Sequence, residues 1–321
     1  MSTFESIKTS RPCPLSNSKD AFLVASKDRH GGKLRNVISR ESGLIFVDPI
    51  PFKNTEEFYK KEYRQAYKGV EQPKAKHVYR AGQNALKRHQ RISSLIPING
   101  PVLDAGSSSG EFVYLLKSQK IVAEGIEANH GYADFSKRQL GLDVSIQAFS
   151  EFSSNRSFNL ITMFHVLEHL ENPTIDLNHL CSFLNPKGHL IIEVPNILYP
   201  DMAFRNKWHS GHLFSYCEHT LRNLAEKLGL AVIYCEAIED GGNLFGVFQK
   251  VSQAIPVEQN TQLSIKKKVE LLHIQGFKYY FQFRNLLKVF KKIGRFFIEK
   301  KKTRGKNAKE ILKKLYESPS P

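Results

Sequence analysis

The chain has 321 residues, with 47 lysines and arginines against 31 aspartates and glutamates, and a formal net charge of +16. This length holds one α/β domain of ordinary size with appended segments. No apolar run approaches the roughly 18 residues of a membrane span, and the first residues lack the apolar stretch of a signal peptide. The four cysteines form no C-x-x-C pair, so we expect a cytoplasmic protein without a disulfide framework.

The positive charge is concentrated at one end of the chain. Residues 251–321 hold 17 of the basic and 5 of the acidic residues, whereas the first 250 residues hold 30 and 26. The basicity therefore belongs to a C-terminal tail. A nearly neutral remainder argues against a large nucleic acid spread across it.

Residues 1–55 predict a small β-rich module. Short strand-like segments fall at 21–26, 36–39 and 44–47, with a turn at Gly31-Gly32. Residues 56–96 then change to helical periodicity and predict a helical cap or linker. Three tyrosines, Tyr59, Tyr63 and Tyr67, recur on one face of its first helix, and a second helix covers 78–96.

Residues 97–252 alternate between strand and helix patterns. Strands are predicted at 101–106, 121–127, 143–147, 158–164, 188–194, 230–236 and 243–250, and helices at 110–119, 130–140, 173–184 and 217–228. The last two strands are joined by the turn residues 239–242. We therefore predict an α/β fold whose seven-stranded, mostly parallel, doubly wound sheet ends in an antiparallel hairpin.

One turn in this region is typical of a nucleotide-binding site. A buried strand from Val102 leads into a turn of small residues, 106–110, that opens a helix. Small residues let the backbone approach a ligand, and the helix N-terminus offers N–H groups to an anion. The next strand ends in Glu127, whose carboxylate can accept hydrogen bonds from both ribose hydroxyls. Ser108 and Glu111 occupy the second and third glycines of the dinucleotide fingerprint, so this is not that fingerprint.

Four segments in order resemble the motifs of the S-adenosylmethionine-dependent methyltransferases with a Rossmann-like core. They are VLDAGSSSGEF (102–112), GIEAN (125–129), FNLITMFHVLEHL (158–170) and LNPKGHLIIEVPN (184–196). Two residues depart from the usual pattern: Ser108 replaces the central glycine, and Asn159 replaces an aspartate. We expect Ser108 to weaken cofactor binding at most and Asn159 to contact backbone.

The resemblance implies S-adenosyl-L-methionine as the cofactor and one cleft at the carboxyl ends of the strands. The cofactor-binding residues that it implies are Asp104, Gly106, Ser107, Ser108, Ser109, Gly110, Glu127, Ala128, Asn129, Ala148, Phe149, Phe164 and His165.

The N-terminal module resembles a zinc ribbon that begins some sugar methyltransferases. Cys13 keeps one ligand position, while Ser16, Ser39 and Ser42 replace three cysteines. A structural zinc site needs four good donors, so we expect a ribbon-like module and no metal. An ordinary N-terminal extension with a chance Cys-Pro pair is the alternative.

Methyl transfer from a sulfonium needs alignment and often a base. The candidates are His165 after the fourth strand and three residues of the segment after the fifth: His209, His212 and Tyr216. His212 best matches the residue that supplies the base in some sugar methyltransferases. Gly211 replaces the glutamate of some C-methylating relatives, which argues against C-methylation. The alternatives are that Glu168 and His169 only orient a helix start, and that the loop histidines are surface residues.

The acceptor class is narrowed by missing motifs. The fourth strand ends in MFH instead of the N/D-P-P-Y of base N-methyltransferases, and no Pro-Cys nucleophile is present. The resemblance points to a sugar nucleotide or lipid-linked glycan. An RNA methyltransferase that uses its basic tail for phosphate contacts, and a non-catalytic cofactor-binding scaffold, are the alternatives. The sequence is compatible with a homo-oligomer.

Residues 253–321 predict a basic amphipathic tail. Seven apolar residues recur at helical spacing (Tyr279, Phe283, Leu286, Leu287, Phe290, Ile293 and Phe297), and basic residues lie opposite. We predict that residues 264–314 bind an anionic membrane, peripherally on its cytoplasmic face. The alternative is that the apolar face packs on the catalytic domain or on a second subunit.

Overall fold

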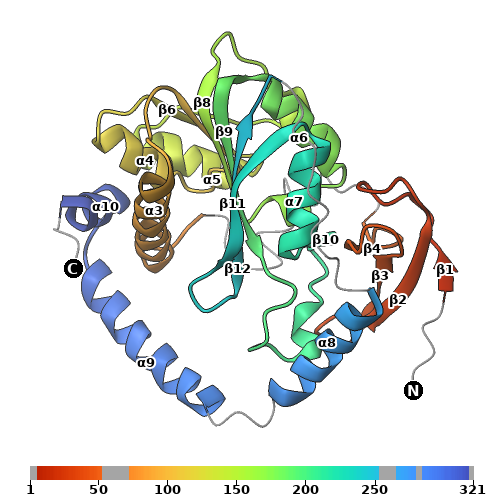
Figure 1. The fold of residues 1–321 in the computed structure, drawn as a ribbon. Coiled ribbons are helices and arrows are strands. Elements are labelled where there is room, and N and C mark those ends of the chain that lie inside the picture. Colours follow the sequence, from red (N-terminus) through yellow and green to blue (C-terminus); the bar gives the residue numbers. More distant parts are fainter. Residues whose placement is uncertain (1–5, 53–71, 253–264, 280–283, 318–321) are drawn as a thin grey trace. The chain divides into compact units, whose positions relative to one another are not determined.

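The computed structural model describes residues 6–52, 72–252, 265–279 and 284–317 (Figure 1). The chain forms two compact units. The first unit comprises Met1–Lys53, Phe164–Ser182 and Pro186–Phe283, and the second comprises Asn54–Met163, Phe183–Asn185 and Arg284–Pro321. The predicted stripe of Tyr59, Tyr63 and Tyr67 lies outside the described residues.

The predicted seven-stranded sheet is confirmed, with the order β11-β12-β9-β8-β5-β6-β7. Its strands are β5 (Val102–Ala105), β6 (Ala123–Ile126), β7 (Val144–Ser145), β8 (Phe158–Phe164), β9 (Leu184–Pro195), β11 (Leu230–Ile238) and β12 (Asn243–Lys250). β8, β5, β6 and β7 are parallel, and β12 pairs antiparallel with both β11 and β9. β9 begins four residues earlier than the sequence predicts, at Leu184 instead of 188.

Helices complete the second unit. They are α3 (Ala75–Leu95), α4 (Glu111–Ser118), α5 (His130–Phe135) with a π-helical turn (Ser136–Leu140), α9 (Arg284–Thr303) and α10 (Ala308–Glu317). The predicted helix 130–140 therefore changes type after Phe135. α10 packs closely on α3 at Gly82. A Cβ added to Gly82 would lie 2.7 Å from Leu312 and 2.8 Å from Leu315, so the close approach of the two helices requires glycine there. The C-terminal segment thus contributes to this unit.

The predicted amphipathic stripe from Tyr279 to Phe297 does not form one described helix. α8 (Ile265–Lys278) belongs to the first unit and α9 to the second, and 280–283, which include Phe283, lie outside the described residues. α9 is fixed to α3 by Arg80, whose Nη2 donates to Glu299 Oε2 at 2.6 Å. Across the described helices, none combines the length and apolarity needed to cross a bilayer.

The first unit contains a five-stranded antiparallel sheet in the order β1-β2-β3-β4-β10. Its strands are β1 (Ser6–Lys8), β2 (Asp20–Lys27), β3 (Lys33–Ser39), β4 (Ile45–Val47) and β10 (Phe214–Ser215). Sequence analysis predicts the three central strands and misses β1 and β10, which have three and two residues. Segments that short carry no periodicity, so only pairing with β2 and β4 defines them.

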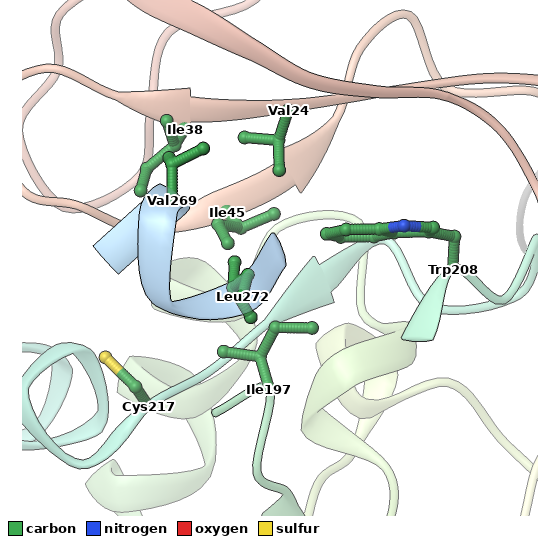
Figure 2. Packing of buried hydrophobic residues seen from close by; sticks show 8 residues of the cluster. All are labelled: Val24, Ile38, Ile45, Ile197, Trp208, Cys217, Val269 and Leu272. Carbon is green, nitrogen blue, oxygen red and sulfur yellow. The ribbon is translucent and has the colours of Figure 1, made fainter. Parts of the chain in front are cut away.

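The hydrophobic core of the first unit joins this sheet to α8 (Figure 2). Val24, Ile38 and Ile45 come from the strands, and Val269 and Leu272 come from α8. Ile197, Trp208 and Cys217 complete the cluster, and Leu272 is fully buried. Burying a leucine contributes about 1.5–3 kcal/mol, so α8 is a structural part of the unit. The helices α6 (Pro173–Ser182) and α7 (Glu218–Lys227) also belong to the first unit.

The four ribbon positions come together in two pairs. Cys13 Sγ lies 3.2 Å from Ser42 Oγ, and Ser16 Oγ lies 3.2 Å from Ser39 Oγ. Backbone N–H groups also face these oxygens: Leu44 donates to Ser42 Oγ at 3.3 Å. The four side chains at the predicted ribbon positions therefore lie in one local polar cluster.

Candidate active site

The glycine-containing turn lies between the ends of β5 and β6. The backbone N–H groups of Gly106 and Ser107 both donate to the Ile126 carbonyl, at 2.8 and 2.9 Å. Gly106 and Gly110 adopt φ of +82° and +85°, which favours glycine. A Cβ on Gly110 would lie 2.5 Å from Leu142 Cδ1. Backbone conformation and close packing together explain the small residues.

Glu127 is buried beside this turn with both carboxylate oxygens engaged. Oε2 accepts from the Ser108 backbone N–H at 2.8 Å, and Oε1 accepts from the Asn129 N–H at 2.9 Å. The side chain of Asn129 in turn caps α5, because its Oδ1 accepts from the Tyr132 N–H at 3.1 Å. The carboxylate predicted to bind the ribose is therefore held in place by the backbone on both sides.

Asp104 lies on β5, one strand residue before the turn. It is 3% exposed, and Thr162 Oγ1 on β8 donates to it at 2.7 Å. Burial raises the pKa of Asp104 to about 6, although the hydrogen bond from Thr162 acts in the opposite direction. Asp104 thus ties two neighbouring strands together in addition to its predicted place near the cofactor.

The second unit brings together most of the predicted cofactor residues. Residues 104, 106–110 and 127–129 follow or end β5 and β6, and Ala148 and Phe149 follow β7 at a 3₁₀ turn (Phe149–Glu151). These strands are parallel, so their carboxyl ends share one edge. Phe164, buried at the end of β8, and His165 belong to the first unit.

Asn159, the second departure from the usual motif, contacts backbone as expected. Its Nδ2 donates to the Asn99 carbonyl at 3.1 Å, and its Oδ1 accepts from Asn185 Nδ2 at 2.6 Å. These bonds connect the start of β8 with the segment before β5 and with the start of β9, so the residue has a structural role.

The first unit contains a cluster of histidines and glutamates. His165 has φ of +55°, and its Nε2 lies 3.0 Å from Glu193 Oε1 and its Nδ1 3.5 Å from Glu168 Oε1. Burial would lower the pKa of His165, but its bonds with Glu168 and Glu193 raise it to about 9. Burial likewise opposes ionisation of Glu168, but His165 and its neighbours lower the Glu168 pKa to about 2. His165 is therefore an imidazolium at neutral pH.

The loop 209–213 completes this cluster. The Leu213 N–H donates to the Glu168 carbonyl at 2.8 Å, and His169 Nδ1 lies 2.6 Å from the Gly211 carbonyl. The His212 ring lies 4.9 Å from the His169 ring, edge to face, and stacks on His209 at 4.5 Å. His169 therefore binds the loop. Burial lowers the pKa of His212 to about 3 and that of His209 to about 4, so both rings are neutral at pH 7.

The predicted site residues differ in exposure. His212 is half-buried, whereas His209 is 8% and Tyr216 1% exposed. Burial raises the pKa of Tyr216 well above 10, and its hydroxyl has no hydrogen-bond partner among the described residues. Sequence analysis missed Glu193, because a glutamate in the strand segment IIEVPN carries no signal of its contact with His165.

The chain is also similar to known proteins. Residues 76–234 match the model of a methyltransferase domain family. No curated protein has a sequence that matches this chain.

Several solved structures are similar at low identity. A putative methyltransferase in complex with the Haloferax volcanii Trm112 activator has 14% identity and a TM-score of 0.45, covering 56% of this chain and 96% of that one. Magnesium protoporphyrin IX methyltransferase from Synechocystis PCC 6803 with bound SAM has 12% identity and a TM-score of 0.44, covering 62% and 99%. An amino pentose methyltransferase from Micromonospora echinaspora has 16% and 0.44, covering 60% and 98%.

The sheet, the glycine turn with its buried acidic residue and the matched domain define the class of protein. The chain contains a methyltransferase domain with a Rossmann-like core, and the cofactor of this domain is S-adenosyl-L-methionine. The residues present fit that cofactor, since the turn offers close backbone approach and Glu127 offers a fixed carboxylate to a ribose.

Proposed function

We propose that the enzyme transfers a methyl group from S-adenosyl-L-methionine to a sugar nucleotide or a lipid-linked glycan. The observation that carries the proposal is the Gly106–Gly110 turn with Glu127 bonded to it. The acceptor class is supported by the end of β8, where Met163, Phe164 and His165 replace the residues that grip the amine of a nucleobase. The near balance of charge over the first 250 residues also favours a small polar acceptor.

His212 is the residue that we propose acts on the acceptor. An acceptor oxygen forms a bond to the methyl carbon as the carbon–sulfur bond breaks, which leaves S-adenosylhomocysteine, and the acceptor's proton passes to His212. Its half-buried ring supports this role better than the buried Tyr216 or His209. The backbone carbonyl of Glu168 accepts a hydrogen bond from the Leu213 N–H, and this bond fixes the loop that carries His212.

Replacing His212 tests this role. His212→Ala should lower turnover by about 10²–10⁴-fold, the usual contribution of a general base, and leave S-adenosylhomocysteine affinity unchanged. His179→Ala, on α6 of the same unit, is the matched control. Calorimetry gives the affinity and single-turnover kinetics give the rate. Equal rates for His212→Ala and wild type would remove His212 from the reaction.

The acceptor class is tested with labelled cofactor. Methyl groups should enter sugar nucleotides or extracted lipid-linked glycans, and mass spectrometry would identify the modified fragment. Transfer into RNA, with a steep salt dependence, would instead establish the nucleic-acid alternative. Failure of the wild-type chain to bind S-adenosylhomocysteine would contradict the cofactor site itself.

We further propose that the N-terminal module is a zinc ribbon that has lost its metal, as in the sugar-associated methyltransferases that it resembles. Cys13 pairs with Ser42, and Ser16 pairs with Ser39. The two pairs support this origin, because each joins one position of the first ligand pair of a ribbon (13 and 16) to one position of the second (39 and 42). The triple variant Ser16→Cys, Ser39→Cys, Ser42→Cys should bind one zinc ion at these positions. A variant that folds and binds no zinc would contradict the proposal.

We also propose that α9 contacts an anionic lipid surface on the cytoplasmic face of a membrane. Phe296, Phe297 and Ile298 are 50%, 64% and 56% exposed, and the last turn of α9 carries Lys300, Lys301 and Lys302. An apolar triplet next to basic residues suits the interface of an anionic bilayer, where each basic residue contributes about 1 kcal/mol. Because Glu299 is buried against Arg80, this exposed face is fixed in orientation on its own unit.

Vesicle co-sedimentation tests the lipid surface. Replacing Phe296, Phe297 and Ile298 with serine should abolish binding to vesicles rich in anionic lipid. Ile175→Ser on α6 removes an equally exposed apolar residue (64%) and should change nothing. Wild-type protein that stays in the supernatant at low salt would contradict the proposal.

A further inference from the structure

The C-terminal helix α10 packs against elements that adjoin the glycine turn 106–110, here called the cofactor turn. Leu312 of α10 is fully buried, and the helix contacts α3, α4 and the π-helical turn 136–140. A capping box begins α10: Asn307 Oδ1 accepts from the Glu310 N–H, and Glu310 Oε2 accepts from the Asn307 N–H, both at 2.9 Å. The position of α10 is therefore specified by its own sequence as well as by its packing.

One hydrogen bond joins α10 to the first residue of α4. The Tyr316 hydroxyl donates to the Glu111 backbone carbonyl at 2.9 Å. A carbonyl has two lone pairs, so it can accept this bond in addition to one within its own helix. The rings of Tyr316 and Tyr114 lie 6.2 Å apart, so the phenol also packs on α4. Burial, and then the charge of Glu111, raises the pKa of Tyr316 well above 10, so its hydroxyl keeps the proton that it donates.

Glu111 also binds the cofactor turn. Ser109 Oγ donates to Glu111 Oε1 at 2.6 Å, and both residues are buried. The π-helical turn, which α10 also contacts, binds the cofactor turn at the next residue: Ser136 Oγ donates to the Ser108 carbonyl at 3.3 Å. Glu111 therefore contacts α10 through its backbone and the cofactor turn through its side chain.

We propose that Tyr316 is a positioning residue for S-adenosyl-L-methionine, and that α10 thereby sets the affinity of the cofactor site. The backbone of the cofactor turn must approach its ligand closely, so a small displacement of the turn costs affinity. Tyr316 fixes the start of α4, and Glu111 at that start orients the hydroxyl of Ser109, a predicted cofactor residue. Tyr316 acts through these two contacts without touching the cofactor. The proposal concerns the cofactor alone, so it does not depend on the identity of the acceptor.

Tyr316→Phe tests the bond, because it removes the hydroxyl and keeps the ring. The affinity of the full chain for S-adenosylhomocysteine, measured by calorimetry, should fall by about three- to tenfold, the range for one hydrogen bond. Tyr114→Phe makes the same chemical change on the neighbouring ring and should leave the affinity unchanged. Ile311→Val removes a methylene from a buried residue of α10 and controls for stability, since it loosens the packing of the helix but keeps the bond.

A double-mutant cycle tests the route through Glu111. Tyr316→Phe should cost less affinity in a Glu111→Ala background than in wild type, because the contact with Ser109 is already lost there. Hydrogen exchange of residues 106–115 should be faster in Tyr316→Phe, while far-UV circular dichroism confirms that every variant is folded. Unchanged affinity in folded Tyr316→Phe, even with faster exchange, would reduce the bond to a structural one and overturn the proposal. An equal loss in Ile311→Val, or fully additive losses in the cycle, would also overturn it.

Discussion

Two buried glutamates, one in each unit, are held in different ways. Glu127 in the second unit accepts from backbone N–H groups of Ser108 and Asn129, both within 19 residues of it. Glu168 in the first unit faces side chains, His165 and His169 nearby in sequence and His212 from a distant loop. A site built on backbone depends on chain conformation, whereas one built on side chains depends on which residues are present. The two should therefore respond to different substitutions.

The largest effect is expected from the backbone of the turn. Gly110→Val combines a φ of +85° with a Cβ 2.5 Å from Leu142 Cδ1 and 3.0 Å from Ser136 Oγ. We expect about 4 kcal/mol of destabilisation, since left-handed strain and overpacking add. Gly141→Val is the matched control: its φ is +68° but its Cβ would meet no atom within 4 Å, so only the strain of about 1–2 kcal/mol applies. Urea unfolding measures both. Equal losses would show that packing around Gly110 adjusts freely.

Glu168→Ala should cause the next largest loss of stability, because it removes interactions between side chains. Among the residues that the structure describes, it leaves His165 with Glu193 as its one carboxylate partner, and it opens a cavity. Breaking a buried pair costs about 3–5 kcal/mol, but the ring of His165 is 37% exposed, so we expect about 2–3 kcal/mol. Glu168→Gln keeps the shape and should lose less. Urea unfolding measures the change. A loss below that of Glu124→Ala, a half-buried glutamate on β6, would show that the pair contributes little.

Glu127→Ala should act on cofactor binding in addition to folding, because it also removes the acceptor of the Ser108 and Asn129 N–H groups. It removes the carboxylate predicted to accept from the ribose, so the affinity for S-adenosylhomocysteine should fall by about 1.5–3 kcal/mol. Calorimetry measures the change. Glu124→Ala removes a carboxylate of β6, the strand that Glu127 follows; this carboxylate pairs with Arg156 at 3.6 Å, and its loss should leave affinity unchanged. Similar losses in both variants would mean that the strand, and not the Glu127 carboxylate, determines affinity.

The contrast also explains what the sequence predicts well. The turn 106–110 and Glu127 lie within about 20 residues, so spacing along adjacent strands is enough to bring them together. Much of the sheet follows because β8, β9 and β12 are long, and β8 and β12 have the predicted bounds. By contrast, Glu193 joins His165 only through the pairing of distant segments, and β10 exists only against β4. Contacts between distant residues leave no periodic signal.

The C-terminal segment shows the same limit. Its apolar pattern predicts helical structure, but the predicted stripe from Tyr279 to Phe297 does not form one described helix. The pattern also does not reveal that Val269 and Leu272 of α8 lie in the core of the first unit. Nor does it reveal that Tyr316 of α10 donates to the Glu111 carbonyl at 2.9 Å, at the start of the helix that follows the cofactor turn. An amphipathic helix has the same pattern whether its apolar face meets protein or lipid. Burial, known only from the structure, separates the packed residues from the exposed triplet at Phe296.

The smallest effect is expected where the turn departs from its usual sequence. Ser108 adopts φ of +53° at the position of the usual glycine, and its N–H donates to Glu127. Ser108→Gly removes about 1 kcal/mol of left-handed strain, but it adds about 0.4–1 kcal/mol of unfolded-state entropy, so stability should change by less than about 0.5 kcal/mol. Cofactor affinity should tighten by at most a few-fold, because Glu127 keeps both of its backbone donors. Ser108→Ala, which retains the Cβ but not the hydroxyl, separates the two contributions. If both variants lose affinity tenfold in calorimetry with S-adenosylhomocysteine, the Ser108 hydroxyl itself binds the cofactor. If only Ser108→Gly tightens binding tenfold, the Cβ obstructs it.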